Sequence, residues 1–247
     1  MTILLSSSKS MQINNFKAHQ MPLFFKEAQQ LNEKLKELSK KNVFEFFKSS
    51  ESLTEKIYDN IKKWDKESHE NKSQAALYSF SGDAFTKLSP ESLSKKGKTN
   101  AEKWIRILSG LYGILKPMDS IHPYRLDMAQ KFEGEVLTNY WKNKITQSLN
   151  EKDQSDIIVN LASKEYSNAI DRNVLDRRWI DVDFYERKND NLKMVSIFSK
   201  QARGLAARYI CENIKKEKDI ENLKHFTSAG YLFDNKLSTH NKWIFVK

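Results

Sequence analysis

Short apolar runs and alternating segments along the chain predict several strands. Residues 3–5 and 156–161 are short, mainly apolar runs, as buried strands are. Residues 179–184 alternate between apolar and polar side chains, which indicates a half-buried strand. The polar turn at 189–191 predicts that this strand pairs as a hairpin with residues 192–198. Two further strands are predicted at 75–80 and 243–246.

Apolar residues three or four positions apart predict amphipathic helices between these strands. Capping-box patterns at 52–55 and 99–102 mark the start of two helices, and Gly110 is expected to end the second in the left-handed conformation. Helices and strands interleave without a regular βαβ cadence, which predicts one compact α+β domain over residues 1–247, with a mixed sheet and surrounding helices. The predicted helices are 22–38, 52–64, 100–109, 136–149 and 199–214.

Composition indicates a soluble, cytoplasmic globular protein, for which a monomer is favoured and no membrane partner is expected. Hydrophobic residues make up 39% of the 247 positions and charged residues 30%, a balance that suits a packed core and excludes a membrane protein. No apolar run approaches the roughly 20 residues of a spanning helix, and residues 1–5 are too short for a signal peptide. Cys211, the single cysteine, excludes an internal disulfide and is expected to be buried in the core.

The formal charge of +10, from 42 basic and 32 acidic residues, favours polyanionic partners such as nucleic acid. The basic residues are spread along the chain without a basic tail, so a lysine-rich surface that serves solubility is the alternative interpretation. Charge alone therefore leaves nucleic-acid binding open.

The standard catalytic and cofactor motifs are absent. The chain has no P-loop, no dinucleotide-binding glycine triplet and no nucleophile elbow. Its five histidines never occur at metal-ligand spacing. We therefore expect neither a metal nor a cofactor, and no known catalytic activity is indicated.

The first candidate site lies around two closely spaced glycines. Ser109, Gly110 and Gly113 follow a predicted helix, where free backbone N–H groups can form a nest for an anion. Arg125 adds a guanidinium that grips phosphate or carboxylate through two hydrogen bonds. The alternative is a helix cap, a turn and a structural ion pair of Arg125 with Asp127.

The second candidate site lies at the start of the helix predicted over 199–214. Lys200, Arg203 and Arg208 lie off its apolar stripe, and a helix amino terminus itself favours anions. Four of the eight arginines of the chain fall in these two candidate sites, namely Arg106, Arg125, Arg203 and Arg208. The alternative is an exposed basic face without a ligand.

Two polar positions that follow predicted strands complete the set. Lys9 follows the first strand, at the end where open sheets present ligand-binding loops. Asp83 follows the strand predicted over 75–80 and is the candidate carboxylate for acid–base chemistry. A turn or a helix N-cap is the alternative role for each.

Taken together, these segments resemble the YaaA family of bacterial peroxide-stress proteins. Residues 6–9 depart from the family's usual Ser-Pro-Ala-Lys, because Ser7 and Ser8 occupy the middle positions. The matching stretches occur in the family's order across essentially the whole chain, at 6–9, 80–83, 108–113, 123–126, 160–166, 200–204 and 229–231.

The resemblance implies a cytoplasmic protein that limits hydrogen peroxide damage, lowers free iron and binds double-stranded DNA through a positively charged cleft. It also implies a YaaA-type fold with a helix-hairpin-helix element, which would map onto the helix 100–109 and the hairpin 109–113. DNA binding is expected to be without sequence specificity. The residues expected to contact phosphate are Lys9, Arg106, Ser109, Gly110, Gly113, Arg125, Lys200, Arg203 and Arg208.

Two function classes follow. In the first, the protein is a non-catalytic stress protein that binds DNA and limits iron-dependent damage. In the second, it is an enzyme on a nucleotide, nucleoside or nucleobase, with Asp83 as the acid or base. Both predict that five side chains meet in one cleft, namely Lys9, Asp83, Arg125, Lys200 and Arg203.

Overall fold

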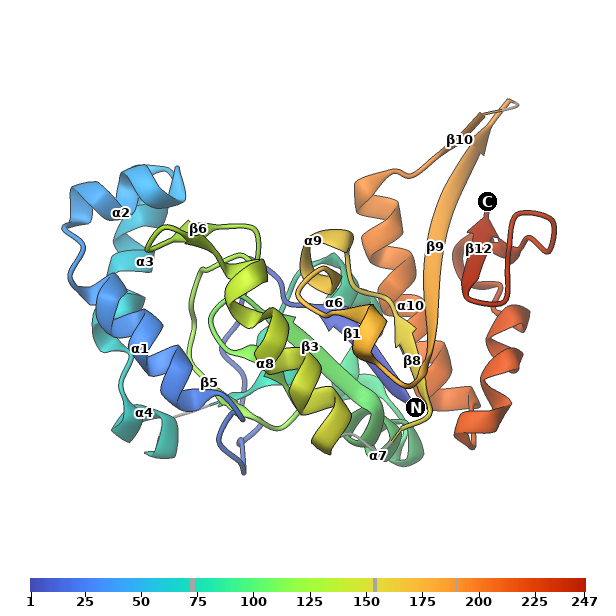
Figure 1. The fold of residues 1–247 in the computed structure, drawn as a ribbon, viewed down its shortest axis with the longest axis horizontal. Helices are drawn as coiled ribbons and strands as arrows, with labels where there is room; N and C mark the ends of the chain where they lie inside the picture. Colours follow the sequence, from blue (N-terminus) through green and yellow to red (C-terminus); the bar gives the residue numbers. More distant parts are fainter. Residues whose placement is uncertain (72–73, 153–154, 190) are drawn as a thin grey trace.

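An eight-stranded sheet forms the centre of the molecule (Figure 1). The structure is a computed structural model, and it describes residues 1–71, 74–152, 155–189 and 191–247. The strands lie in the order β11-β12-β9-β8-β1-β3-β4, and β10 pairs with β9. Their bounds are β1 Thr2–Ser6, β3 Ile105–Ser109, β4 Gly113–Leu115, β8 Ile157–Asn160, β9 Arg178–Lys188, β10 Asn191–Lys193, β11 Leu232–Phe233 and β12 Lys242–Val246.

The middle of this sheet is parallel and its margins are antiparallel. Strands β12, β9, β8, β1 and β3 run in the same direction, whereas β4, β10 and β11 run against their neighbours. The chain builds outward from β1 to β3 and β4, then returns to the other side of β1 to form β8, β9 and β12. A topological switch point therefore lies between β1 and β8.

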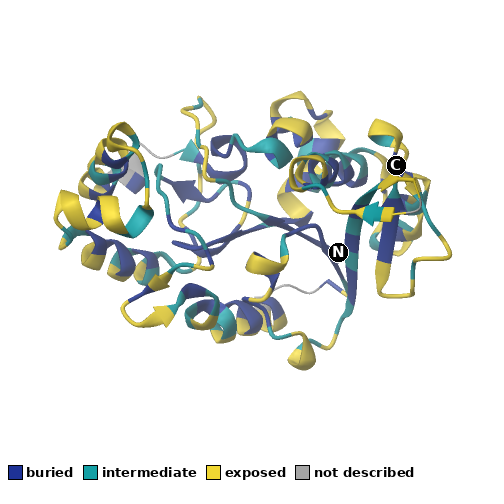
Figure 2. Cartoon of the chain, turned by 90° about the horizontal axis from the view of Figure 1, so that it is seen from above, coloured by how far each residue is buried: buried dark blue, intermediate teal, exposed yellow. Residues whose placement is uncertain are grey.

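Helices cover both faces of the sheet, which makes this an α/β fold with a mixed sheet rather than the predicted α+β fold. Helix α8 lies on one face, and α6, α7 and α10 lie on the other (Figures 1 and 2). The α-helices are α1 Phe25–Lys36, α2 Lys40–Phe47, α3 Glu51–Lys63, α4 Lys66–Asn71, α5 Ala76–Ser79, α6 Asp83–Leu88, α7 Lys95–Trp104, α8 Leu137–Lys152, α9 Lys164–Ser167 and α10 Ser196–Asn213.

Shorter elements complete the chain. Two-stranded pairs are formed by β2 (Gln74–Ala75) with β5 (Ser120–Ile121) and by β6 (Lys131–Phe132) with β7 (Glu135–Val136). Short 3₁₀ helices occur at Pro90–Ser92, Arg172–Val174, Glu217–His225 and Ser228–Gly230. In the described part of the chain, no helix combines the length and apolarity needed to cross a membrane.

The core follows the apolar runs that the sequence marks. Ile3 and Leu4 of β1 are fully buried, and Trp141 of α8 is buried against the sheet. Cys211 is buried as predicted, and burial raises the pKa of its thiol to about 12. The thiol is therefore protonated at neutral pH, as in a buried core cysteine.

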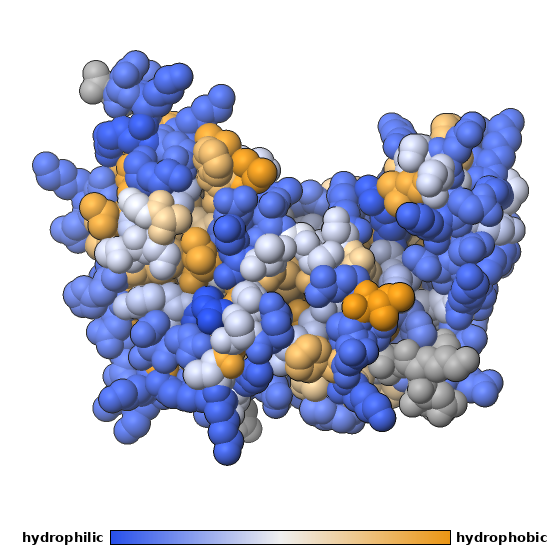
Figure 3. All heavy atoms as spheres, turned by 180° about the vertical axis from the view of Figure 1, so that it is seen from behind, coloured by the Kyte–Doolittle hydropathy of each residue, from blue (hydrophilic) through white to orange (hydrophobic). Residues whose placement is uncertain are grey.

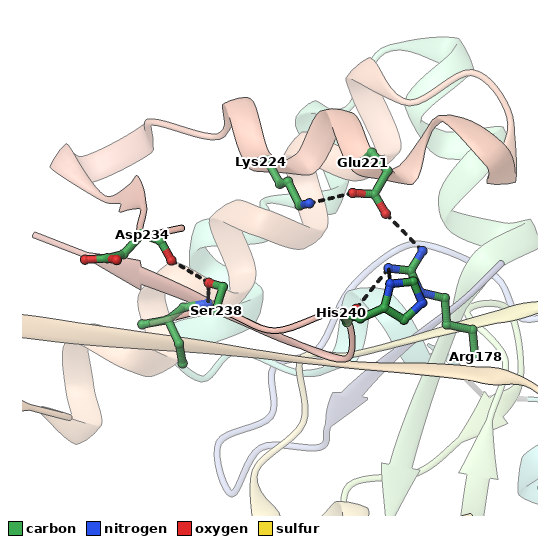
Figure 4. A network of polar contacts seen from close by, with 7 residues as sticks. Arg178, Glu221, Lys224, Asp234, Ser238 and His240 are labelled. Carbon is green, nitrogen blue, oxygen red and sulfur yellow. Dashed lines mark hydrogen bonds and ion pairs between the residues drawn. The ribbon is translucent and has the colours of Figure 1, made fainter. Parts of the chain in front are cut away.

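A polar network fastens the C-terminal segment to the sheet (Figure 4). The Arg178 guanidinium lies 2.9 Å from the Glu221 carboxylate and donates to the His240 carbonyl at 2.9 Å. Lys224 lies 2.7 Å from the same carboxylate. Partial burial opposes the charge on Glu221, but its two cationic partners outweigh burial and lower the pKa of this carboxyl. Arg178 thus has a structural role.

The prediction of a helix over 100–109 is wrong about both where the helix begins and where it ends. Helix α7 begins after Ser94, whose hydroxyl accepts from the Gly97 N–H at 3.0 Å, and ends at Trp104. From Ile105 onward the chain forms β3, which pairs in parallel with β1. Gly110 therefore does not cap a helix, and its φ is not positive.

Other boundaries also differ from prediction. The strand predicted over 75–80 is only β2 followed by the helical turn α5. Helix α3 is capped by Ser50 rather than Ser52, and α10 begins at Ser196. The predicted hairpin is confirmed as β9 with β10, but its second strand ends at Lys193, and residues 196–198 belong to α10. Asp190 at its turn lies outside the described residues. The predicted strands at 3–5, 156–161, 179–184 and 243–246 and the helices of α1 and α8 are confirmed.

Candidate functional site

A cleft of about 810 Å³ opens at the carboxyl ends of the parallel strands, beside the switch point. Its size lies in the range of small-molecule sites. Its walls come from the loop after β1, the segment from Leu161 to Tyr166 after β8, the start of α6, and the first turns of α10. Asp183 and Tyr185 of β9 close one side.

Two glycines allow these walls to approach one another. A Cβ on Gly204 of α10 would overlap the backbone carbonyl of Ala84, so only glycine permits this contact between α10 and α6. A Cβ on Gly82 would lie 2.6 Å from the Cβ of Ser8, and the Gly82 N–H donates to the Ser8 hydroxyl at 3.1 Å. These contacts bring Asp83 to the cleft wall beside the cations of α10.

The structure brings four of the five expected residues together. Lys9, Asp83, Lys200 and Arg203 line the cleft. Arg125 does not, and the expectation that it joins them is wrong. It lines a small separate cavity between helices α1 and α3 and the segment 123–126 before β6. The reason is that Tyr124 points inward to bond the Ser109 hydroxyl at 2.7 Å, which turns the next side chain away.

The remaining predicted phosphate contacts lie elsewhere. Arg208 donates to the Leu88 and Ser89 carbonyls at 2.9 and 3.1 Å and so holds the loop after α6. Arg106 on β3 donates to the backbone carbonyls of Lys103 and Ile105 at 3.1 and 2.8 Å. Neither lines the cleft.

The turn from Ser109 to Gly113 is a buried β-hairpin turn between β3 and β4. Ser109 is fully buried, and the Gly110 carbonyl accepts from the Trp141 indole at 2.8 Å. Gly113 has φ +70° and lies against the Trp141 ring. A buried turn offers no access to a DNA phosphate, and strand β3 rather than a helix leads into it, so the mapping of a helix-hairpin-helix onto these residues is wrong.

The cleft carries no net charge. Lys9 is paired with Asp127 at 2.9 Å, and Asp183 is paired with Lys242 at 3.5 Å. Positive and negative side chains in the lining are equal in number, which differs from the positively charged cleft that the resemblance implies. The four cations are Lys9, Lys164, Lys200 and Arg203, and the four carboxylates are Asp83, Asp127, Glu165 and Asp183.

Hydroxyl groups form the floor of the cleft. The Ser6 hydroxyl accepts from the Ser163 N–H at 2.9 Å and joins the ends of β1 and β8. Ser7 donates to the Tyr166 hydroxyl at 3.4 Å, which in turn donates to Asp127 at 3.4 Å. Burial raises the pKa of Tyr166, with a further rise from the Asp127 charge. Tyr166 is therefore a neutral donor at physiological pH.

Two polar atoms of α10 are buried in the cleft wall without a partner among the described residues. They are the Ser199 hydroxyl, in a side chain only 2% exposed, and Nε of Arg203. Burial lowers the pKa of Arg203 and the Asp183 charge opposes this, but a guanidinium stays protonated in proteins. Both atoms therefore have unused capacity to bind a ligand.

Sequence reasoning missed several lining residues. Lys164 and Tyr166 lie in the stretch 160–166 that resembles the family, but their position after a parallel strand was the signal that mattered. Ser199 precedes Lys200 on the same helix turn and carried no signal of its own, because an unpartnered hydroxyl is visible only in three dimensions. The described residues contain no group of three or more potential metal ligands.

The fold and the cleft define an α/β protein with a ligand-sized site at the switch point of its sheet. A family model described as peroxide stress protein YaaA matches residues 1–237. The chain belongs to this family.

Curated proteins similar to this chain include several from the genus Francisella that are named UPF0246 proteins. One from Francisella philomiragia subsp. philomiragia is 38% identical over an alignment of 256 positions, which covers 100% of both chains. One from Francisella tularensis subsp. novicida is 35% identical and one from subsp. mediasiatica is 36% identical, again with full coverage of both chains. The resemblance seen in the motifs thus extends along the whole chain.

Proposed function

We propose that this peroxide-stress family member binds a nucleotide, nucleoside or nucleobase in the cleft and acts on it, with Asp83 as the acid or base. One observation carries the proposal. Among the described residues, Asp83 and Lys200 line the cleft without a hydrogen bond or ion pair to any other side chain. Unpaired opposite charges that face one cavity suit a small ligand with both donors and acceptors better than they suit a duplex.

The lining also provides the two surfaces that such a ligand needs. Met194, which is 37% exposed, offers apolar area for a planar ring, and the nearly buried Leu5, Phe85 and Leu161 lie behind the wall. The hydroxyl floor and Asp83 offer acceptors and donors for ring nitrogens and exocyclic groups. Asp83 is the first residue of α6 and faces the cavity. Its carboxylate does not cap the helix, because Gly82 is the N-cap and no side chain bonds the first N–H groups.

Thermal unfolding with a panel of nucleobases, nucleosides and nucleotides tests this proposal. A ligand at 100 times its Kd stabilises the folded state by about 2.7 kcal/mol, which a shift in Tm detects. Conversion of each hit is then followed by chromatography and mass spectrometry. Asp83→Asn keeps the shape of the side chain and is expected to lower turnover by about 10²–10⁴-fold, as for removal of a general acid or base.

Lys87→Met, an exposed change on the same helix as Asp83, is the matched control and is expected to leave Tm shifts and turnover unchanged. If no member of the panel raises Tm, the proposal is wrong. If a ligand binds and Asp83→Asn turns over as fast as the wild type, the role of Asp83 is wrong.

A second candidate function is duplex DNA binding outside the cleft. Helix α7 packs on α10, and both α7 and the segment after α10 carry exposed lysines. These are Lys95, Lys96, Lys103, Lys215, Lys216 and Lys218. We call them the α7 lysine face. Helix α7 lies behind the sheet in Figure 1, and Figure 3, which shows the molecule from behind, has a largely hydrophilic surface with some hydrophobic patches. Phosphate contacts here would let the protein compete with iron for the DNA backbone and so limit iron-dependent damage.

Binding of unrelated duplexes across a salt series tests this candidate. Log affinity is expected to fall linearly with log salt, because each phosphate contact releases a counterion. The charge reversal Lys95→Glu with Lys103→Glu and Lys215→Glu is expected to abolish binding. Lys200→Glu in the cleft is the control and is expected to retain it. A slope near zero, or loss of binding only with Lys200→Glu, contradicts DNA binding by the α7 lysine face.

A further inference from the structure

We propose that the amino-terminal turns of α10 form an anion subsite within the cleft, which binds the phosphate group of a phosphorylated ligand. The inference rests on the proposed function, because it assigns the class of ligand that the same cleft takes. It makes the ligand a nucleotide or another phosphate ester rather than a free nucleoside or base.

The cleft-facing side of α10 presents only hydrogen-bond donors of the kind that phosphate accepts. Ser196, Ser199, Lys200 and Arg203 recur at positions three, four and seven apart, which places them on one side of the helix. No carboxylate lies among them. This helix is 18 residues long, and its N-cap Val195 has no side chain that caps the first N–H groups. Its positive dipole end is therefore available to an anion.

The Ser199 hydroxyl gives an independent indication of a ligand. The side chain is only 2% exposed and lines the cleft, and its hydroxyl has no partner among the described residues. A buried hydroxyl without a partner destabilises a protein unless a ligand completes its bonds. Nε of Arg203, one helical turn further on, is also buried and has no partner among the described residues. A single phosphate group has enough acceptor positions to bond both.

The acidic residues near α10 do not remove this preference. Asp183, whose charge acts on Arg203, is itself paired with Lys242 at 3.5 Å. Asp83 stands on α6 across the contact of Gly204 with Ala84 and faces the same cavity. The ligand that satisfies both walls has its phosphate at α10 and a donor group, such as an amino or ring N–H group, at Asp83.

Isothermal titration with adenosine, adenosine monophosphate, guanosine, guanosine monophosphate and inorganic phosphate tests the subsite. For the base that the cleft prefers, the monophosphate is expected to bind at least tenfold more tightly than the nucleoside. Ser199→Ala and Arg203→Lys are each expected to weaken the monophosphate at least tenfold and to leave the nucleoside unchanged. Ser199→Ala is expected to keep or raise the Tm of the unliganded protein, because it removes an unpaired buried hydroxyl.

Ser167→Ala is the matched control. Its hydroxyl is also fully buried and unpartnered among the described residues, but it does not line the cleft. We expect a similar change in Tm and no change in the affinity for the monophosphate.

The outcomes separate the two proposals. Equal affinities for nucleoside and monophosphate would overturn the subsite and leave the proposed function standing. A lower Tm in Ser199→Ala with unchanged affinity for the monophosphate would assign the hydroxyl a structural role and also overturn the subsite. If neither the nucleosides nor the monophosphates bind, and inorganic phosphate does not bind either, both proposals are overturned.

Discussion

Replacing Gly204 with alanine is expected to lower the free energy of unfolding by about 3 kcal/mol, the upper range for overpacking a close contact. The added Cβ would overlap the Ala84 carbonyl, which is backbone and cannot rotate away. Helices α10 and α6 must then separate, and Asp83 moves away from Lys200 and Arg203. Chemical denaturation measures the stability loss, and titration of the cleft ligand is expected to show weaker binding in the folded fraction.

Gly97→Ala provides the matched control, because it makes the same change inside helix α7. There the added Cβ would lie 2.9 Å from the Glu212 carboxylate, the far end of a flexible side chain. Alanine is also the better helix former by about 1 kcal/mol. We expect a small change in stability and unchanged ligand binding. Equal stability losses in the two variants would show that the α6–α10 contact is not as close as the structure places it.

The strands that sequence reasoning predicts correctly are those whose pattern is local. Residues 3–5 and 157–159 are continuous apolar runs because both faces of a central parallel strand are buried. The segment 101–108 misled because Ala101, Trp104, Ile105 and Leu108 recur at helical spacing, while Ile105 and Ile107 also alternate as in a strand. Pairing with β1 decides between them, and the order of strands in a sheet depends on contacts between distant residues that periodicity does not record.

The site was predictable where chain position and chemistry agree. Lys9 follows a central strand, and Lys200 and Arg203 start a helix, so topology alone brings them to the carboxyl edge of the sheet. Asp83 reaches the same edge although the strand predicted before it is a helical turn. The prediction for Arg125 is wrong because the direction of a loop side chain depends on the neighbour that packs inward, and here that neighbour is Tyr124.

Net charge was the least informative signal for the site. The total of +10 is a property of the whole chain, whereas the cleft balances four cations with four carboxylates. The excess instead appears on solvated surfaces such as the α7 lysine face. A sum over the sequence cannot report this separation, because it depends on which helices meet in space.

Alanine at Gly110 or Gly113 is expected to destabilise the fold by about 2–3 kcal/mol each, by overpacking a buried turn and, at Gly113, by backbone strain. At Gly110 the added Cβ would overlap the Leu126 carbonyl, with no unusual backbone angle. At Gly113 it would lie 2.6 Å from the Trp141 ring, and φ is +70°. Ligand and DNA affinities of the folded protein are expected to stay unchanged, because neither glycine reaches the cleft or the α7 lysine face.

Gly134→Ala separates strain from contact. Its φ is +86°, but nothing lies within 4 Å of the added Cβ, so we expect only the conformational cost of about 1 kcal/mol. Denaturation of the three variants should therefore rank Gly134→Ala as the mildest. If Gly113→Ala were instead as stable as the wild type and bound duplex DNA more weakly, the hairpin turn would have to face the phosphate backbone. That result would contradict its burial against Trp141 and would restore the helix-hairpin-helix interpretation that the structure replaces with a strand.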